Sequence, residues 1–427
     1  MRLISLKIEE LYDTLNLDLN FHEELNLLVG INGSGKTSAL SVIDWLLTPN
    51  YAKLATQTYK RLALSIEKDG QKFDISAEND GDVALVKVET DTDTFHPIAI
   101  PVERLDRRFE MEDAYRGLSP DEEEVKAWDF LDNLRKPTVV SLERTITAEV
   151  EKEVYYERPR PPHKRNRRTT PLEHVQEIFG QHYADYRGQV GENDTRLKSQ
   201  IILTALHSPD ADQPTLPSFQ FPQESTEQLE AKVLNYLSSS FPSEDVSNHV
   251  PRFFSYFRSL SDEIEQSSEK SGKVVDLIQS QFSRVDNLAR AFKEFEERNA
   301  EAFSHLKAYL DAVNKFLKDS NKLVYADSRG RLVFAELKNG MPIGSSRPIS
   351  KMSSGETQII ILFALMAFES AENSVFIVDE PELSLHPKWQ TEFMESFLRL
   401  CPSNSQVLVA THSPEIAAGR KTSCVFF

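Results

Sequence analysis

The chain has 427 residues, 40% of them hydrophobic, so its length allows two or three domains with a sizeable buried core. Its formal net charge of −18 makes most of the surface repel nucleic acid and acidic membranes. With Cys401 and Cys424 as its two cysteines, it supports neither a disulfide framework nor a cysteine zinc site. The longest apolar run, 359–368, is about half of a membrane span, and the opening residues lack a signal-peptide core. We therefore expect a cytoplasmic protein with no membrane contact.

The first thirty residues predict two or three strands that lead into a glycine-rich loop. Residues 15–21 alternate apolar and polar side chains, as a half-buried strand does. The apolar segment 25–29 then runs into Gly30-Ile31-Asn32-Gly33-Ser34-Gly35-Lys36-Thr37, which matches G-x-x-x-x-G-K-[ST]. A helical apolar pattern, 38–47, follows and is stopped by Pro49. A chance match is the alternative, but the flanking strand and helix argue against it.

A strand, a glycine loop and a helix form the arrangement in which backbone N–H groups and a helix N-terminus face an anion. We expect Lys36 to reach the β- and γ-phosphates of a nucleotide and the Thr37 hydroxyl to bind Mg²⁺. The expected nucleotide-binding residues of this loop are Gly30, Asn32, Gly33, Ser34, Gly35, Lys36, Thr37 and Ser38.

An antiparallel sheet is predicted beside this loop. Alternating apolar residues indicate three strands, at 61–67, 72–75 and 84–88. Asp69-Gly70 is a favourable turn between the first two. A fourth compact strand is predicted at 138–142, and the polar pair that follows it either reaches the nucleotide or is simply solvated.

The middle of the chain has a different composition and indicates an inserted helical region. Residues 100–135 look irregular and acidic, and 158–168 form a proline-broken basic arm. Helical patterns cover 171–207 and 226–239, with a proline-rich stretch between them. The longest pattern, 273–318, repeats apolar residues at steps of three and four, which is typical of a seam for a partner helix. We expect an intrachain helical lid rather than a free coiled coil, because the other helices lie nearby in the chain.

The second half of the site is expected after a predicted hairpin at 322–335. Residues 374–378 have the pattern of a buried parallel strand that ends in Asp379 and Glu380. A hydrophobic strand that delivers an acid at its carboxyl end is the usual way to hold Mg²⁺ beside a phosphate-binding loop. We assign Asp379 to the metal and Glu380 to the attacking water as general base. The alternative is that Asp379 and Glu380 are simply a surface pair of acids, but the motif that follows directly at 381–387 argues against it.

Two other segments carry polar groups at the ends of predicted elements. The segment around Ser353 begins a predicted helix, where a serine and a glycine at the helix N-terminus offer a second anion site. The same residues are also typical of a helix cap, in which a serine pairs with a glutamate three positions later. A buried strand at 406–411 ends in His412, which we take as catalytic because the acid-bearing strand is expected beside it. The candidate residues of the second anion site are Ser353, Ser354, Gly355 and Glu356.

These segments, in this order, resemble the heads of ABC-type ATPases. The matches are Lys36 and Thr37 with the Walker A loop, Ser353 to Glu356 with the signature motif, Asp379 and Glu380 with Walker B, and His412 with the switch histidine. One departure is Ser354, which stands where the signature usually has glycine. Another is the glutamine loop, which is not identifiable; 141–144 is only a candidate.

Two stretches indicate a branch of these ATPases. Asp-Glu-Pro-Glu-Leu-Ser-Leu-His-Pro at 379–387 and Ala-Thr-His-Ser-Pro at 410–414 look like the OLD (overcoming lysogenization defect) and RecF/SMC-related branch rather than transporters. Ser384-Leu385-His386 falls where that branch keeps its dimer-facing D-loop. The resemblance covers roughly 1–50 and 340–420.

The resemblance implies an α/β fold, with an ABC-type P-loop ATPase head of mixed sheet and antiparallel subdomain and an inserted α-helical lid. We expect the first half of the head at 1–150, the lid at 151–320 and the second half of the head at 321–427. The family hydrolyses ATP with Mg²⁺ at an interface between two subunits, where the loop of one faces the signature serine of the other. We therefore expect a homodimer or a higher homo-oligomer.

The expected role is that of an ATPase subunit that controls a separate effector. Full OLD-type nucleases continue into a Toprim domain, and the residues after 414 do not supply one, so we expect no nuclease activity of the chain's own. The protein would then be similar to the ATPase components of two-gene anti-phage systems of the PARIS and Septu kinds. The alternatives are a RecF/SMC-like DNA-repair or DNA-binding ATPase and a free-standing regulatory NTPase. The arm at 158–168 favours nucleic acid, whereas the net charge favours a protein partner.

Overall fold

A computed structural model describes residues 1–102, 115, 118–140, 146–147, 170–206, 225–240, 243–266, 272–370, 372 and 374–427. The chain divides into two compact units, one made of Met1–His182 with Lys307–Phe427 and the other of Tyr183–Leu306. The basic arm at 158–168 and the glutamine-loop candidate at 141–144 lie outside the described residues.

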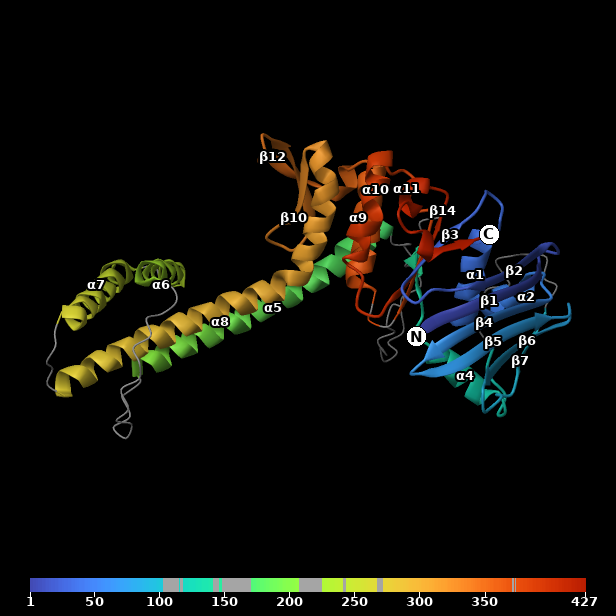
Figure 1. Cartoon of the computed structure of the whole chain (residues 1–427), viewed down its shortest axis with the longest axis horizontal. Coiled ribbons are helices and arrows are strands. Elements are labelled where there is room, and N and C mark those ends of the chain that lie inside the picture. The colour runs from blue at the N-terminus through green and yellow to red at the C-terminus, as the bar shows by residue number, and fades with distance from the viewer. Residues whose placement is uncertain are drawn as a thin grey trace, which may run out of the picture. The chain divides into compact units, whose positions relative to one another are not determined.

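The first unit contains a six-stranded antiparallel sheet with the strand order β2-β1-β4-β5-β6-β7 (Figure 1). Its strands are β1 (Arg2–Leu11), β2 (Leu15–Asn20), β4 (Arg61–Lys68), β5 (Gln71–Asn79), β6 (Val83–Thr90) and β7 (Ile98–Pro101). Alternate residues such as Leu62, Leu64 and Ile66 are fully buried, which is the period-two pattern of a sheet with one covered face. The three predicted strands are thus confirmed as β4, β5 and β6, and the sheet is extended by β1 and β2 on one side and by β7 on the other.

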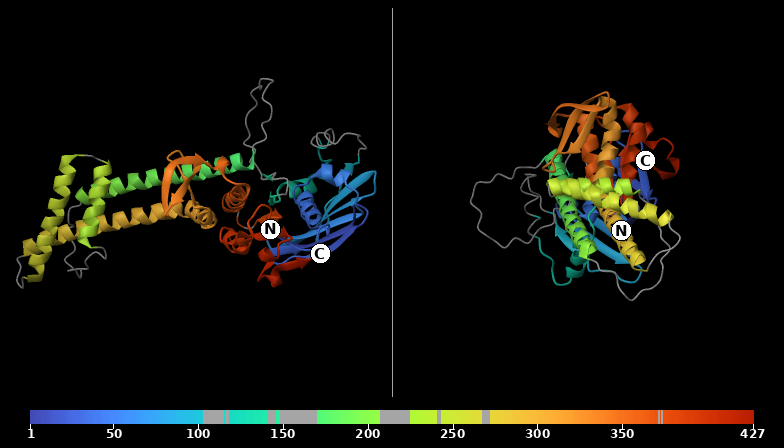
Figure 2. Two further views of the ribbon diagram at one scale, coloured as in Figure 1. Left: turned by 90° about the horizontal axis from the view of Figure 1, so that it is seen from above. Right: turned by 90° about the vertical axis from the view of Figure 1, so that its left-hand side faces the viewer.

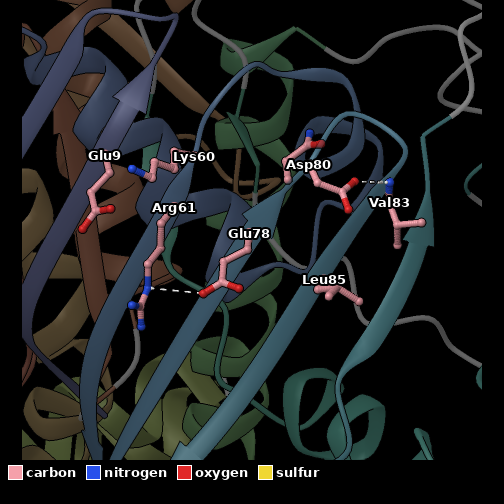
Figure 3. A pocket seen from close by; sticks show the side chains of 8 residues that line it. Glu9, Lys60, Arg61, Glu78, Asp80, Val83 and Leu85 are labelled. Atoms are coloured by element: carbon pink, nitrogen blue, oxygen red, sulfur yellow. Dashed lines mark hydrogen bonds and ion pairs between the residues drawn. The ribbon is translucent and has the colours of Figure 1, made fainter.

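The uncovered face of this sheet carries a row of charged side chains. Glu9, Arg61 and Glu78 are direct cross-strand neighbours, and they line an open cavity of ≈ 410 Å³ (Figure 3). The Arg61 Nε atom lies 3.7 Å from Glu78 Oε1. Exposed pairs of this kind contribute little stability, so the row mainly keeps the face polar.

A second sheet of six strands has the order β15-β3-β14-β13-β8-β9 and is parallel except at β9. Its strands are β3 (Leu25–Val29), β8 (Thr138–Val140), β9 (Ile146–Thr147), β13 (Val375–Asp379), β14 (Gln406–Thr411) and β15 (Cys424–Phe426). β3, β13 and β14 are almost entirely buried apolar runs, as expected for central parallel strands. Because these three strands are parallel neighbours, their carboxyl ends meet at one edge of the sheet.

The helices of the first unit cover both sheets. They are α1 (Lys36–Leu47), α2 (Tyr51–Thr56), α4 (Val125–Asp132), α9 (Ser354–Phe368), α10 (Pro387–Leu398) and α11 (Pro414–Ala417), with short 3₁₀ turns at Lys318–Ser320, Ile349–Lys351 and Lys421–Ser423. One core cluster joins α1, the buried face of the antiparallel sheet, and residues of β13 and β14 such as Ile377 and Leu408. The loop between β3 and α1 is therefore held by both sheets.

Two expectations for this unit need correction. Residues 100–135 are not wholly irregular, because α4 buries Ala127 and Leu131, one helical turn apart, behind an acidic run. The predicted hairpin at 322–335 is confirmed as β10 (Lys322–Ala326) and β11 (Leu332–Lys338), but a third strand, β12 (Met341–Pro348), extends it. All eight residues of β12 are exposed, so its sequence lacks the alternation of apolar and polar residues that indicates a half-buried strand.

The second unit is helical. Its helices are α5 (Pro171–Leu206), α6 (Thr226–Ser240), α7 (Glu244–Gln266) and α8 (Gly272–Leu317), of which α5 and α8 extend beyond the unit. Within it, α5 and α8 run antiparallel (Figure 1), since Asn193 donates to Asn299 at 2.9 Å while Tyr186 meets Phe303. The seam predicted on α8 thus has an intrachain partner.

Helices α6 and α7 lie across this pair (Figure 2) and complete a small core. Val285 and Phe292 of the predicted seam are buried in it beside Phe254 and Phe257 of α7. The sequence reading missed α7, because Pro251 interrupts its pattern. None of the helices in the described part of the chain combines the length and apolarity that a membrane span needs.

Candidate active site

The glycine-rich loop lies between β3 and α1, as its pattern predicts. Gly35 is the N-cap of α1 with φ 97°, and Gly33 has φ 80°, both in the left-handed region that glycine adopts without strain. A Cβ atom at Gly35 would lie 2.8 Å from Leu15 Cδ1. The turn therefore needs glycine both for its backbone conformation and for the close approach of β2.

Lys36 is buried, with 4% of its surface exposed. Its Nζ atom donates to the carbonyl oxygens of Gly30 at 3.0 Å and Ile31 at 3.1 Å, and lies 3.5 Å from His412 Nδ1. Burial lowers the pKa of Lys36 from its usual value, although the Glu380 carboxylate acts in the opposite direction. A buried cation that donates to neutral carbonyl oxygens is suited to bind an anion brought to the loop.

Asp379 ends β13, and the Thr37 side chain interacts with its carboxyl group in the direction that lowers the pKa of Asp379. Burial raises the pKa of Asp379 to about 6, and the charges of Glu380 and Glu382 act in the same direction. Its Oδ1 atom is buried and has no hydrogen-bond partner among the described residues. A hydroxyl beside an orphaned carboxylate oxygen fits the hard oxygen ligands of Mg²⁺.

Glu380 and His412 follow β13 and β14 at the same edge. Glu380 has φ 49° and precedes Pro381, a strained conformation held by a hydrogen bond from its N–H to the Ala410 carbonyl at 2.8 Å. Its Oε1 atom lies 3.4 Å from His412 Nε2. Since the other ring nitrogen faces Lys36, the histidine stands between the loop lysine and the candidate base.

An open cavity of ≈ 480 Å³ surrounds this group. The sequence reading missed one wall of it, formed by Tyr12, Thr14 and Leu15 from the turn between β1 and β2. Tyr12 is 46% exposed and has φ 54°, and an aromatic residue in a tight turn was the available signal. The remaining lining residues are Asn32, Gly33, Gly35, Lys36, Thr37, Ser38, Glu380 and His412.

Two predicted residues of the loop, Gly30 and Ser34, do not line the cavity. A Cβ atom at Gly30 would lie 2.6 Å from Ser34 Oγ, so this glycine keeps the loop closed on itself. The Ser34 hydroxyl is buried and has no partner among the described residues.

The helix-cap interpretation of Ser353 is confirmed. Ser353 is the N-cap of α9 and shares a capping box with Glu356, whose Oε2 accepts the Ser353 N–H at 2.8 Å. Glu356 is 3% exposed, and both its oxygens accept from Lys322 Nζ at 2.8 Å. Burial tends to raise the pKa of Glu356, but the bonds from Lys322 and Ser353 lower it overall. The sequence reading missed Lys322, since it begins a hairpin far from the cap.

The four signature residues do not line the cavity around the loop. One of them, Gly355, lies against the predicted D-loop turn instead, because a Cβ atom at Gly355 would lie 2.4 Å from the Ser384 carbonyl oxygen. One chain therefore brings together Lys36, Thr37, Asp379, Glu380 and His412, while Ser353, Ser354, Gly355 and Glu356 form a separate group.

The mixed sheet with a glycine-rich loop after β3 defines an α/β protein with a phosphate-binding loop. The profile of the AAA ATPase domain family matches residues 1–417, and the chain belongs to that family. Nucleotide binding is the function that membership assigns to it.

A curated relative is the Retron Vc95 probable ATPase of Vibrio cholerae serotype O1 biovar El Tor. It is 26% identical over an alignment 192 residues long, and the match covers 40% of this chain and 36% of the relative. The match thus spans little more than a third of that protein's length.

Solved structures that match this chain include an Smc head domain from Pyrococcus furiosus, with an extended coiled coil and bound to the C-terminal domain of ScpA. It aligns with 98% of this chain and 91% of its own, at 13% identity and a TM-score of 0.38. A second, SmcHead bound to the C-winged helix domain of ScpA, has the same coverage, with 12% identity and a TM-score of 0.39.

Proposed function

We propose that the chain is a cytoplasmic ABC-type subunit that hydrolyses ATP and controls a separate effector in bacterial anti-phage defence. The convergence of Lys36, Asp379, Glu380 and His412 at the ends of three parallel strands carries the ATPase part of this proposal. Membership of an ATPase family supports it.

Each residue has a role that its surroundings support. Lys36 exchanges the carbonyl oxygens of its own loop for phosphate oxygens, which are better partners for a buried cation. Thr37 and Asp379 would hold Mg²⁺, which neutralises charge that develops on the phosphates. Glu380 accepts the proton of the attacking water, and His412 orients the Glu380 carboxylate. The strained backbone of Glu380 keeps the base at the cavity wall.

The separation of the signature residues from the loop supports a shared site. Since Ser353 lies outside the cavity of its own chain, it would act on a nucleotide held by a second copy. The exposed apolar side chains of Ile31, in the loop, and Leu383, just before the D-loop turn, are surfaces that such a copy would cover. We therefore propose a homodimer, or a higher homo-oligomer, that closes on ATP.

The shared site predicts complementation between two inactive variants. Ser353→Arg should bind ATP nearly as the parent does and stop hydrolysis, because the serine acts on the partner's nucleotide. Mixed in equal amounts with Lys36→Ala, it should restore about a quarter of the parental rate, since half of the dimers are mixed and each has one intact face. Steady-state hydrolysis across mixing ratios measures this.

The matched control is the double variant Ser353→Arg/Lys36→Ala, which cannot supply an intact face to Lys36→Ala. A lack of rescue at every ratio would mean that both motifs act within one subunit, or that both faces must react together.

The defence role rests on the likeness to a retron ATPase over part of its length. Expressed with its neighbouring genes in a bacterial host, the chain should reduce phage plaque formation, and Glu380→Gln should remove this protection. The purified chain alone should hydrolyse ATP slowly and cut no DNA.

The same strains distinguish the rival role in DNA repair. Unchanged plating together with lower survival of Glu380→Gln cells after DNA damage would favour a RecF/SMC-like function. Metal-dependent DNA cleavage by the purified chain that survives Glu380→Gln would contradict the need for a separate effector.

A further inference from the structure

Glu382 lies in the turn after β13, two residues beyond the candidate base. Its Oε1 atom accepts three hydrogen bonds from the segment that carries the histidine. The donors are the Thr411 hydroxyl at 2.8 Å, the His412 N–H at 2.6 Å and the Ser413 N–H at 3.1 Å. Bonds from N–H groups to a carboxylate are among the stronger hydrogen bonds in proteins.

The histidine segment depends on these bonds because it leaves the sheet. β14 ends at Thr411, so the N–H groups of His412 and Ser413 have no neighbouring strand to bind. A backbone N–H without a partner is unfavourable, and Glu382 supplies an acceptor to both, which the Thr411 hydroxyl supplements at Ser413. The His412 side chain is 30% exposed, so packing alone does not fix it.

A second connection joins the same two segments. The Ser413 hydroxyl donates to Gln390 Oε1 at 2.7 Å, and Gln390 Nε2 donates to the Leu385 carbonyl at 3.0 Å. The histidine segment is therefore bonded at several points to the turn and helix that follow the acid-bearing strand.

Glu382 is badly placed to act on substrate itself. It does not line the cavity, whereas Glu380 does. Its free oxygen, Oε2, is buried and has no partner among the described residues, so it meets no attacking water. The charge of Glu382 acts at a distance on Asp379 and Lys36, whereas its hydrogen bonds run to the histidine segment. Alanine and glutamine both remove that charge, so a difference between these two variants reports the hydrogen bonds.

We infer that Glu382 is a positioning residue, which fixes the main chain at 411–413 so that the His412 ring stands between Lys36 and Glu380. This rests on the proposed ATP hydrolysis. It predicts that Glu382 affects turnover rather than nucleotide affinity, because the loop that binds phosphate does not touch it.

The first test compares Glu382→Ala with Glu382→Gln. Alanine removes the acceptor, and kcat should fall about 10²-fold, the loss expected when a catalytic group is misplaced by about 1 Å. The Kd for ATP should change less than about threefold, because the loop that binds phosphate does not touch Glu382. Glutamine retains a carbonyl oxygen for the three donors, so kcat should recover at least ~10-fold relative to alanine.

Glu380→Gln is the matched control, because the same substitution at the base should not recover. Equal losses in Glu382→Gln and Glu380→Gln would overturn the inference and make Glu382 a proton acceptor. An unchanged kcat in Glu382→Ala would also overturn it.

A double-mutant cycle with His412→Ala tests whether Glu382 acts through the histidine. Residues that act as one unit are strongly non-additive. Once His412→Ala has removed the ring, adding Glu382→Ala should change kcat less than about threefold. Full additivity of the two losses would show that Glu382 acts by another route.

A third measurement does not need ATP turnover. Amide hydrogen exchange of His412 and Ser413 should accelerate in Glu382→Ala and remain close to the parent in Glu382→Gln, since both amides donate to Oε1. Unchanged exchange in Glu382→Ala would overturn the inference, whereas a parent without ATPase activity but with this exchange pattern would overturn only the proposed function.

Thr411→Val serves as a second variant where Glu382→Ala does not fold. It removes one donor to the same oxygen while keeping the shape of the buried side chain. Exchange at Ser413 should again accelerate, because the Thr411 hydroxyl also accepts its N–H at 3.0 Å. Parental exchange and parental kcat in this variant would count against the inference.

Discussion

Glu380→Gln will bind ATP but hydrolyse it at least ~10²-fold more slowly than the parent, the lower range for loss of a general base. Glutamine keeps the shape of the side chain and its place beside His412, where Glu380 Oε1 lies 3.4 Å from Nε2. It cannot take a proton from water. Single-turnover hydrolysis with excess protein isolates this step from nucleotide binding and product release.

Asp379→Ala is the control for this prediction. It removes the buried carboxylate beside Thr37 and should weaken Mg²⁺-dependent nucleotide binding, rather than slow hydrolysis of bound ATP. If Glu380→Gln weakened binding while Asp379→Ala bound normally and failed in turnover, the two roles would have to be exchanged.

Lys36→Ala should abolish measurable ATP binding. The lysine is 4% exposed, and its ammonium donates to two carbonyl oxygens of its own loop, where phosphate oxygens are expected. Water cannot replace a preorganised charge beside the phosphates, so we expect the affinity for ATP to fall at least ~10²-fold. Titration calorimetry with a slowly hydrolysed ATP analogue measures the loss without turnover.

Lys53→Ala is the matched control, because Lys53 is exposed on α2 and does not line the cavity. It should bind ATP as the parent does. Parental affinity in Lys36→Ala would show that the glycine-rich loop does not bind the phosphates of ATP.

The sequence predicted those parts of the site that depend on local patterns. The glycine loop, the buried strand before it, the helix after it and the cap at Ser353 all follow from residues a few positions apart. The ends of β13 and β14 meet because buried apolar runs of this kind become neighbouring parallel strands.

The parts that the sequence did not predict depend on distant partners. Lys322 holds Glu356 from 34 residues away, and Glu382 holds the N–H of His412 from 30 residues away. Nothing in either local pattern distinguishes these charges from solvated ones. Tyr12 escaped notice for the same reason, since the turn reaches the cavity only because β2 pairs back on β1.

The pairing of β3 with β14 has a consequence for biosynthesis. Val29, just before the glycine-rich loop, is in register with Thr411, and the Leu3 N–H donates to Gln406 Oε1 across 403 residues of sequence. Contacts this distant form late, whereas the helices of Tyr183–Leu306 pair over shorter distances. The ribosome must therefore complete nearly the whole chain before the cavity around Lys36 can close, because a nascent chain that stops before residue 406 lacks β14 and the His412 side of that cavity.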